Sequence, residues 1–387
     1  MNGTTSLVKV VNDPYDKIDS CFSALKNSRQ SAFILCLGST MTSDIEGISA
    51  AGATAADRRL TPRYDAEALV LGKTADGSSI PVSPVGIASP VVLTRACLRI
   101  LESNKTIVDC GTFAPPRIDS IQAGTLPAQC VSSGNALPLD HVYDLFERGL
   151  KIGRDASENN DLVVVGECVP GGTTTAMAVL TGMGNSIASL VSSSIPEGGK
   201  GNGFERRIML VNEGLEMAGL GKGKTKEQEP DPFVLLSKVG DPMQPVAAGI
   251  AIGAASKASV VLAGGSQMLA VHNIATKMAS GLKDTGLKSA FLNSGLVITT
   301  RWVAYDPSAD TPALAKILDI PMACTTFQLK NSRHPGLRAY EEGHVKEGVG
   351  AGATIALAHM TRDKDEASLL HAIEETYQEL VDNNSIK

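Results

Sequence analysis

Two glutamates stand in glycine-rich surroundings and are the side chains best able to do chemistry. Glu167 follows an apolar run in LVVVGECVPGGTTT (residues 162–175), and Glu347 lies in EEGHVKEGVGAGA (341–353). A carboxylate held beside glycines can act as a general base, or can stabilise positive charge that develops on a substrate. Each segment also has a plainer interpretation: Glu347 as a solvated residue before a helix, and 162–175 as an ordinary strand, turn and helix.

The segment 162–175 has the form of an anion-binding turn. Gly171 and Gly172 follow the apolar run and would let the backbone approach a ligand closely. Thr173 and Thr174 then open a helix, where either could cap the helix or donate a hydrogen bond to a phosphate. Because the first N–H groups of a helix attract negative charge, we expect a phosphate to bind at this turn.

Two further glycine-rich segments could bind phosphate. PEGGKGNG (196–203) places glycines around Lys200 and Asn202, which suggests a backbone nest for an anion or else a surface loop. AGLGKGKT (218–225) resembles a nucleotide phosphate loop, but no buried strand precedes it and KEQEPDP after it cannot form the required helix. Residues 219–232 are polar and show no periodicity, so we interpret them as a loop that is exposed or partly disordered.

The elements that must position these residues alternate between strands and helices. Short runs rich in β-branched residues predict strands at 32–37, 106–110, 162–165, 259–262 and 296–300. Their apolar patterning is nearly continuous, as in parallel strands buried on both faces. Helical spacing lies between them, including a helix capped by Asp140. The pattern predicts an α/β fold of three layers with a mostly parallel Rossmann-like sheet.

The composition excludes several classes of protein. The net charge is -6, and no Lys/Arg run exceeds two residues, so a nucleic-acid partner is not expected. The seven cysteines are scattered without a CxxC pair, which favours free thiols in a reducing compartment, and no zinc signature is present. The N-terminus has no apolar signal core, and the apolar stretch 245–271 is interrupted by Lys257. We expect a cytoplasmic protein without a membrane partner.

The motifs, taken in order, resemble the nicotinate-nucleotide:dimethylbenzimidazole phosphoribosyltransferase family, and more closely its archaeal and cyanobacterial branch. Segment 162–175 matches the bacterial stretch GEMGIGNTT, and KEGVGAGA (346–353) matches Gly-Glu-Gly-Thr-Gly-Ala. The other matching segments are GISAAGA (47–53), PVGIASPVVLTRA (84–96), PEGGKGNG (196–203) and AAGIAIGAASKASVVLAGG (247–265). Their order and spacing agree over most of the chain.

This resemblance implies a reaction and a set of site residues. Nicotinate mononucleotide would give its ribosyl phosphate to a benzimidazole or purine-like nitrogen with inversion, nicotinate would leave, and no metal or cofactor would be needed. Glu347 would be the general base, and Glu167 would lie near the ribose or the nicotinate. The residues implied to bind the substrate are Gly171, Gly172, Thr173, Thr174, Lys200, Gly201, Asn202, Gly264 and Gly348.

The resemblance also implies an organisation and a pathway. The large α/β domain would span 30–330, and a smaller helical lobe would combine 1–29 with 331–387. The protein would be a homodimer acting in cobamide lower-loop synthesis.

Several positions depart from the bacterial pattern. Gly172 stands where the family has Asn, Val169 takes a glycine position, and Ala263-Gly264 replaces Asp-Gly. CLGSTMTSDIEG (36–47) stands in place of Ala-Gly-Asp-His-Gly. These departures predict a different acceptor pocket. They also leave an alternative function open, a non-catalytic protein that binds a nucleotide or phosphosugar.

Overall fold

The structure is a computed structural model, and it describes residues 6–184, 187–195, 203–221 and 230–382. Its centre is an eight-stranded sheet in the order β1-β8-β7-β6-β5-β2-β3-β4. Only β1 runs antiparallel to its neighbour. The strands are β1 (Val8–Asn12), β2 (Ser31–Leu37), β3 (Asn104–Asp109), β4 (Ile121–Gln122), β5 (Leu162–Cys168), β6 (Ser259–Ala263), β7 (Gly295–Thr299) and β8 (Met322–Thr325).

The five predicted strands are all present, as β2, β3, β5, β6 and β7. The other three strands, β1, β4 and β8, were not predicted. β1 and β4 lie at the two edges of the sheet and are largely exposed or half-buried, so neither forms a buried apolar run. β8 is only four residues long.

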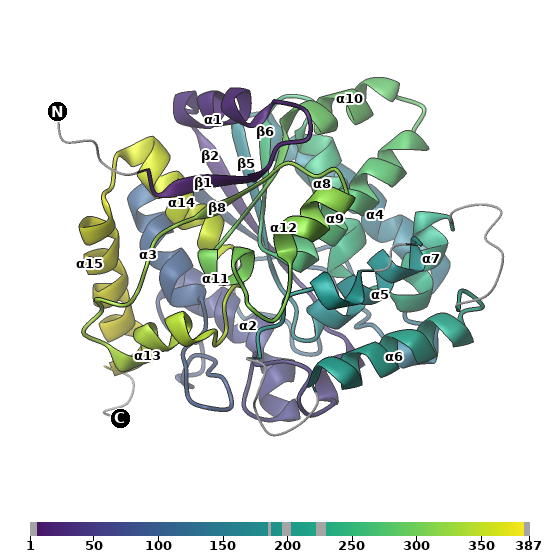
Figure 1. Cartoon of the computed structure of the whole chain (residues 1–387), viewed down its shortest axis with the longest axis horizontal. Helices are drawn as coiled ribbons and strands as arrows, with labels where there is room; N and C mark the ends of the chain where they lie inside the picture. Colours follow the sequence, from purple (N-terminus) through teal and green to yellow (C-terminus); the bar gives the residue numbers. More distant parts are fainter. Residues whose placement is uncertain (1–5, 185–186, 196–202, 222–229, 383–387) are drawn as a thin grey trace.

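Helices cover both faces of the sheet and complete the predicted three layers (Figure 1). The first layer contains α4 (Leu139–Ser157), α5 (Gly172–Gly182), α6 (Gly203–Met217), α7 (Pro232–Val239), α8 (Met243–Ala254), α9 (Ser266–Ser280), α10 (Thr285–Ser294) and α12 (Thr311–Ile317). The second contains α1 (Ile18–Asn27), α2 (Ala55–Leu71), α3 (Val91–Leu101), α11 (Arg301–Ala304), α13 (Pro335–Arg338), α14 (Ala351–Arg362) and α15 (Glu366–Tyr377). Single turns are η1 (Met41–Asp44), η2 (Val131–Ser133), η3 (Ala188–Leu190), η4 (Ala339–Glu342) and η5 (Gln378–Asp382).

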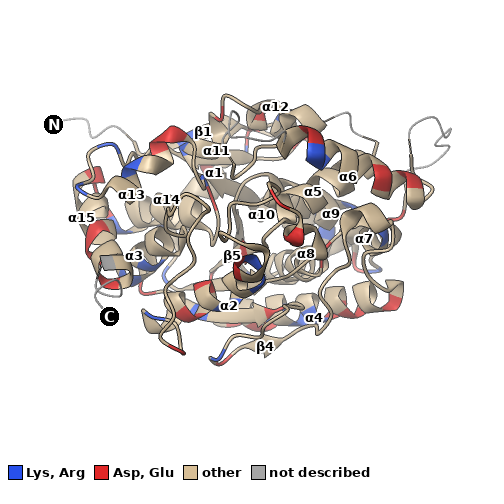
Figure 2. Cartoon of the chain, turned by 90° about the horizontal axis from the view of Figure 1, so that it is seen from below, with Lys and Arg blue, Asp and Glu red and all other residues tan. Residues whose placement is uncertain are grey.

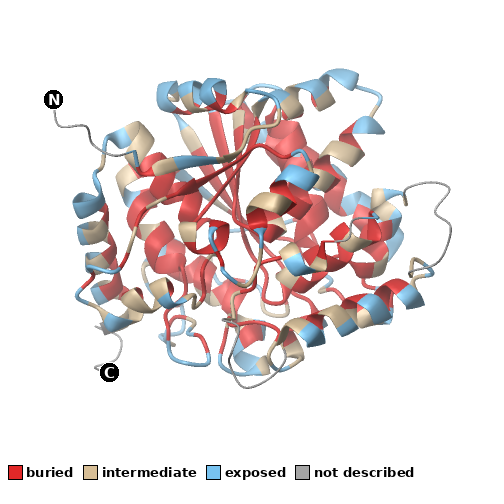
Figure 3. Cartoon of the chain, viewed as in Figure 1, coloured by how far each residue is buried: buried red, intermediate tan, exposed pale blue. Residues whose placement is uncertain are grey.

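The strands are buried on both faces, as their continuous apolar patterning predicts. In β2, Ile34 and Cys36 enter the core of the first layer, whereas Phe33 and Leu35 enter the core of the second. Figure 3 shows the central strands buried and the outward faces of the helices exposed. Charged residues of both signs are spread over the outer helices (Figure 2). The hydrophobic effect therefore holds both helical layers against one sheet.

Helices α4 and α8 of the first layer are in direct backbone contact. A Cβ built on Gly149 would lie 2.4 Å from the carbonyl oxygen of Val246, and one on Gly153 would lie 2.2 Å from that of Ile250. Gly249 and Gly253 of α8 make the reciprocal approach to α4, with built Cβ distances of 2.4 and 2.3 Å to carbonyl oxygens. A side chain at any of these positions would force the two helices apart.

Two predicted helix caps are wrong. Helix α4 begins at Leu139 with Pro138 at its N-cap, so Asp140 lies in the first turn, where a carboxylate is favoured by the helix dipole. Helix α5 has Gly171 at its N-cap with φ 82°, and no side chain caps it. Glycine takes the position because left-handed backbone is costly for other residues. Thr173 and Thr174 therefore belong to the first turn of α5.

The order of the strands creates a switch point between β2 and β5. From β2 the chain proceeds outward to β3 and β4, and it then returns to place β5 on the other side of β2 before proceeding to β6, β7 and β8. Connections that leave in opposite directions open a crevice at the carboxyl ends of such strands. The residues after β2 and β5 are therefore placed at the point where α/β proteins bind ligands.

The remaining expectations about organisation have different outcomes. All seven cysteines are free, as predicted. In the described part of the chain, no helix is long and apolar enough to cross a bilayer. Most of the predicted loop at 219–232 falls within 222–229, outside the described residues. Lys224 and Thr225, which end the phosphate-loop pattern, lie in the same range. The division into a large domain and a helical lobe stays a prediction.

Candidate active site

A cavity opens at the switch point and is bounded by both predicted glutamates. It measures about 670 Å³, counting the solvent at its mouth. Its lining comes from residues 48–52, from positions within 81–90, from the end of β5 and the turn after it, and from 345–349. We call it the main cavity. A smaller one of about 360 Å³, here called the serine cavity, is lined by Ser192, Ser193 and Ser194 and shares Glu167 and Glu347 with the first.

Glu167 is held at the carboxyl end of β5 and is only 5% exposed. The backbone N–H of Val169 donates to its Oε2 at 3.1 Å. Burial, followed by the charge of Glu347, raises the pKa of Glu167 to about 8, while a hydrogen bond from Gln267 acts in the opposite direction. A carboxyl group with this pKa keeps its proton at neutral pH.

Glu347 accepts four hydrogen bonds. Its Oε2 receives the hydroxyl of Thr299 at 3.0 Å and the backbone N–H of Thr300 at 2.8 Å. Its Oε1 receives the N–H groups of Gly348 and Gly352 at 3.1 and 3.2 Å, at the start of α14. Burial raises the pKa of Glu347, and these donors oppose the rise because they stabilise the charged form. Of the two carboxyl groups, Glu347 is therefore the better stabilised as an anion.

The loop that carries Glu347 has unusual backbone geometry. Val345, Lys346 and Val349 have φ values of 64°, 60° and 55°, in a region that L-residues rarely adopt. Hydrogen bonds hold the loop in place: Val349 N–H donates to the carbonyl of Glu167 at 2.9 Å, and the Thr300 hydroxyl donates to that of Lys346 at 2.7 Å. Strain of this kind persists where surrounding contacts impose it, often at functional sites.

A buried ion pair lies beside the same loop. Lys346 Nζ is 2.5 Å from Asp306 Oδ2, and the two side chains are 3% and 1% exposed. Ser192 also donates to Asp306, at 2.5 Å. The pair connects the Glu347 loop to the segment after α11, and Lys346 lines the serine cavity.

The predicted binding residues have different positions. Gly171, Thr173 and Gly348 line the main cavity. Thr174 is fully buried, Gly172 packs beneath the side chain of Gln267, and Gly264 lies against Met268; none of these three lines either cavity. Lys200, Gly201 and Asn202 lie outside the described residues. His344, from the same glycine-rich segment as Glu347, lines neither cavity.

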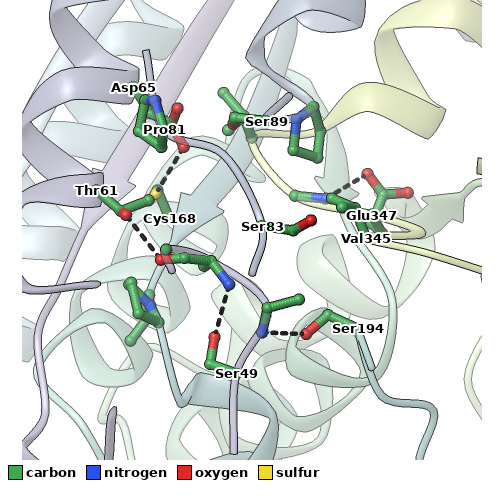
Figure 4. A pocket seen from close by; sticks show the side chains of 18 of the residues that line it. Ser49, Thr61, Asp65, Pro81, Ser83, Ser89, Cys168, Ser194, Val345 and Glu347 are labelled. Atoms are coloured by element: carbon green, nitrogen blue, oxygen red, sulfur yellow. Dashed lines mark hydrogen bonds between the residues drawn. The ribbon is translucent and has the colours of Figure 1, made fainter. Parts of the chain in front are cut away.

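Several lining residues were missed by the sequence analysis. Figure 4 shows Asp65, from α2, with Cys168 donating to it, a contact of 3.3 Å. Burial raises the pKa of Asp65 to about 7. Ser83, Ser89 and Gln267 also line the main cavity. Isolated polar residues give no sequence signal of their own, but the SSS run at 192–194 could have indicated a polar pocket.

Within the described ranges, no three His, Cys, Asp or Glu side chains gather closely enough to hold a metal ion.

Comparison with known proteins decides the family. The model of a family described as Phosphoribosyltransferase matches residues 93–293, more than half of the chain. This chain belongs to that phosphoribosyltransferase family, and the protein is a pentosyltransferase. A UPF0284 protein of Gloeothece citriformis is 41% identical to this phosphoribosyltransferase, with 88% of this chain and 90% of the relative covered. A UPF0284 protein of Saccharolobus solfataricus is 37% identical, with coverage of 92% and 94%. The expected cyanobacterial and archaeal branch is thereby confirmed.

Solved structures with the same fold include two from Thermus thermophilus. CobT matches the phosphoribosyltransferase with a TM-score of 0.61 and 16% identity, over 93% of this chain and 92% of CobT. A structure titled nicotinate-nucleotide-dimethylbenzimidazole phosphoribosyltransferase matches with a TM-score of 0.59 and 17% identity, over 94% and 92%. At this level of identity the likeness establishes the fold.

Proposed function

We propose that the protein transfers ribosyl phosphate from nicotinate mononucleotide to a ring nitrogen of a benzimidazole or purine-like base and releases nicotinate. The observation that carries the proposal is the pair Glu167 and Glu347 on one cavity wall, with unequal stabilisation of their charged forms. The named activity of one structural neighbour supports the choice of donor. The product would serve cobamide lower-loop synthesis.

The reaction needs one base and little acid assistance. The acceptor nitrogen forms a bond to the anomeric carbon while the bond from that carbon to the nicotinate nitrogen breaks. The electron pair of the broken bond returns to the pyridinium ring, which leaves uncharged at its nitrogen. Glu347 takes the proton from the acceptor N–H, which is the role of a general base.

The two glutamates suit different parts of this step. Glu347, the better stabilised anion, also lowers the energy of positive charge developing on the ribose. Glu167 keeps its proton at neutral pH and can donate a hydrogen bond to a ribose or nicotinate oxygen. Pairs of carboxyl groups with separated pKa values commonly divide acid and base roles in this way.

The two cavities suit the two substrates. The main cavity combines apolar residues such as Ile48, Ile87 and Pro90 with Ser83 and Ser89, a mixture that fits a flat heterocyclic base. The serine cavity is bounded by the first residues of α9, while Gly171 and Thr173 bring the start of α5 to the main cavity. Helix N-termini favour phosphate, so we assign the ribosyl phosphate to the junction of the two cavities.

Nicotinate release tests the proposal directly. The protein is incubated with nicotinate mononucleotide and a panel of benzimidazoles and purines, and released nicotinate and the new nucleotide are quantified by chromatography. Base-dependent release, with nicotinate and nucleotide formed in equal amounts, supports the function. Absence of release with every base, under conditions in which the Thermus enzyme turns over, would refute it.

A further inference from the structure

Gln267 occupies the space that a side chain at position 172 would need. A Cβ built on Gly172 would lie 1.9 Å from Oε1 of Gln267 and 2.7 Å from its Cδ. No real side chain tolerates such contacts, so position 172 accepts a larger residue only if Gln267 moves. The two residues belong to different helices, α5 and α9, and both lie in the first turn.

The amide of Gln267 lies between the functional groups of the site. Gln267 lines both cavities, together with Glu167 and Glu347. Its side chain also favours the charged form of Glu167 and so acts to lower the pKa of that carboxyl group. Its Oε1 is buried and has no hydrogen-bond partner among the described residues, an arrangement that is costly unless it serves the site.

We propose that Gln267 is a positioning residue for Glu167, and that its amide reaches the site from α9 through the space that glycine at position 172 leaves open. The catalytic part of this inference, the effect of Gln267 on kcat, rests on the proposed function. Gly172 and Gln267 then form a coupled pair. The absence of a side chain at position 172 leaves a space, and the amide group of Gln267 fills it.

Four proteins test the coupling: wild type, Gly172→Asn, Gln267→Ala and the double variant. We expect Gly172→Asn to lower the Tm, because the new side chain displaces the Gln267 amide from its buried position and also approaches Cβ of Val169 at 3.0 Å. In the double variant the collision with Gln267 is gone, so the Tm should recover most of that loss. Gly281→Asn and Gln30→Ala are the matched controls, because a Cβ on Gly281 has no atom closer than 3.5 Å and Gln30 is exposed.

Turnover distinguishes positioning from mere packing. Gln267→Ala should lose at least tenfold in kcat, and the double variant should regain most of it. Without the Gln267 donor the pKa of Glu167 rises, so the alkaline limb of the pH profile, near pH 8 in the wild type, should move to higher pH. A Gln267→Ala protein with kcat within twofold of wild type and an unchanged pH profile would overturn the proposal. Strictly additive changes in Tm would also overturn it.

The test remains decisive if the proposed function fails. Should the wild type release no nicotinate, the Tm cycle is still measurable, and so is the pH dependence of unfolding. A raised pKa makes the folded state lose stability as pH increases through that pKa. In Gln267→Ala this loss should extend to higher pH than in the wild type. An identical pH dependence in both proteins would reject the contact between Gln267 and Glu167.

Discussion

Glu167 and Glu347 differ in the number of donors around each carboxyl group. Four donors hold Glu347, whereas Val169 and Gln267 are the groups that stabilise the charge of Glu167. The charge of Glu347 further disfavours ionisation of Glu167. The two carboxyl groups therefore titrate as an interacting pair in which the proton is favoured on Glu167, and their apparent pKa values belong to both residues together.

Replacing Glu347 by Gln should abolish most of the turnover. The amide cannot take a proton, and its NH2 group faces two of the four donors that hold the carboxylate, so we expect kcat to fall by about 10²- to 10⁴-fold. Calorimetric titration with nicotinate mononucleotide should show a Kd within a few-fold of wild type. Glu342→Gln, at an exposed position of the preceding turn, is the matched control. A Glu347→Gln protein with more than half of the wild-type kcat would exclude Glu347 as the base.

The pKa of Glu167 predicts a pH-dependent stability. Its folded-state pKa, about 8, lies above the ordinary value of 4.5, so its contribution to stability is complete below about pH 4.5 and is lost as pH rises through 8. Over this window we expect a loss on the order of a few kcal/mol in the free energy of unfolding. Glu167→Gln should flatten the dependence measured by urea denaturation, and Glu147→Gln, exposed on α4, should not. Equal pH dependence in wild type and Glu167→Gln would contradict the assignment.

At the scale of elements, the loop between η4 and α14 determines where Glu347 lies. Hydrogen bonds to β5, to the start of α11 and to the carbonyl of Ser194 impose its positive φ values. The first turn of α14 then approaches β7 so closely that a Cβ on Gly352 would lie 2.2 Å from the Thr299 carbonyl carbon. Three separate elements therefore fix the position of the carboxylate, and these contacts restrict rotation about the side-chain bonds of Glu347.

The Lys346–Asp306 pair is expected to stabilise this loop. Lys346→Met leaves the Asp306 carboxylate buried without its cation, which should cost about 3–5 kcal/mol in the free energy of unfolding. The double variant Lys346→Met/Asp306→Asn should recover much of that loss, because no buried charge remains. Urea denaturation of both variants measures the difference. If Lys346→Met is as stable as wild type, the pair does not hold the loop.

The sequence predicted the parts of the site that are local in the chain. Glu167 and Glu347 each lie in a glycine-rich motif, so a few adjacent residues were enough to identify them. Asp65 and Gln267 enter the cavity from helices whose sequences show no motif, and only the folded chain brings them to Glu167. The threonine cap failed for a related reason: a left-handed glycine ends the turn after β5, which helix propensity does not indicate.

At the scale of the whole molecule, the strand order explains why one crevice collects residues from so much of the chain. Buried apolar runs predicted the central parallel strands, and the alternation with helices predicted three layers. The order of strands and the antiparallel edge strand β1 depend on long-range pairing, which the sequence pattern does not encode. The homodimer stays a prediction that light scattering would test.

The backbone contact between α4 and α8 predicts an unusual response to alanine. In an open helix, Gly→Ala is favourable by about 1 kcal/mol because alanine is the better helix former. Gly253→Ala should instead destabilise the protein by about 1–3 kcal/mol, since its Cβ would lie 2.3 Å from the Leu150 carbonyl oxygen. Thermal or urea denaturation measures the change, with Gly281→Ala as control. A stabilised Gly253→Ala protein would show that the two helices can separate freely.

The contact between α4 and α8 also predicts that the two walls of the site differ in stiffness. Because glycines of each helix lie against carbonyl oxygens of the other, α4 and α8 resist sliding past each other, and they belong to the layer that contributes the starts of α5 and α9. The opposite wall consists of α2 and the loops at 48–52 and 81–90. We therefore expect the second wall to yield more readily as substrates enter and leave, which hydrogen exchange would reveal as faster amide exchange there than in α4 and α8.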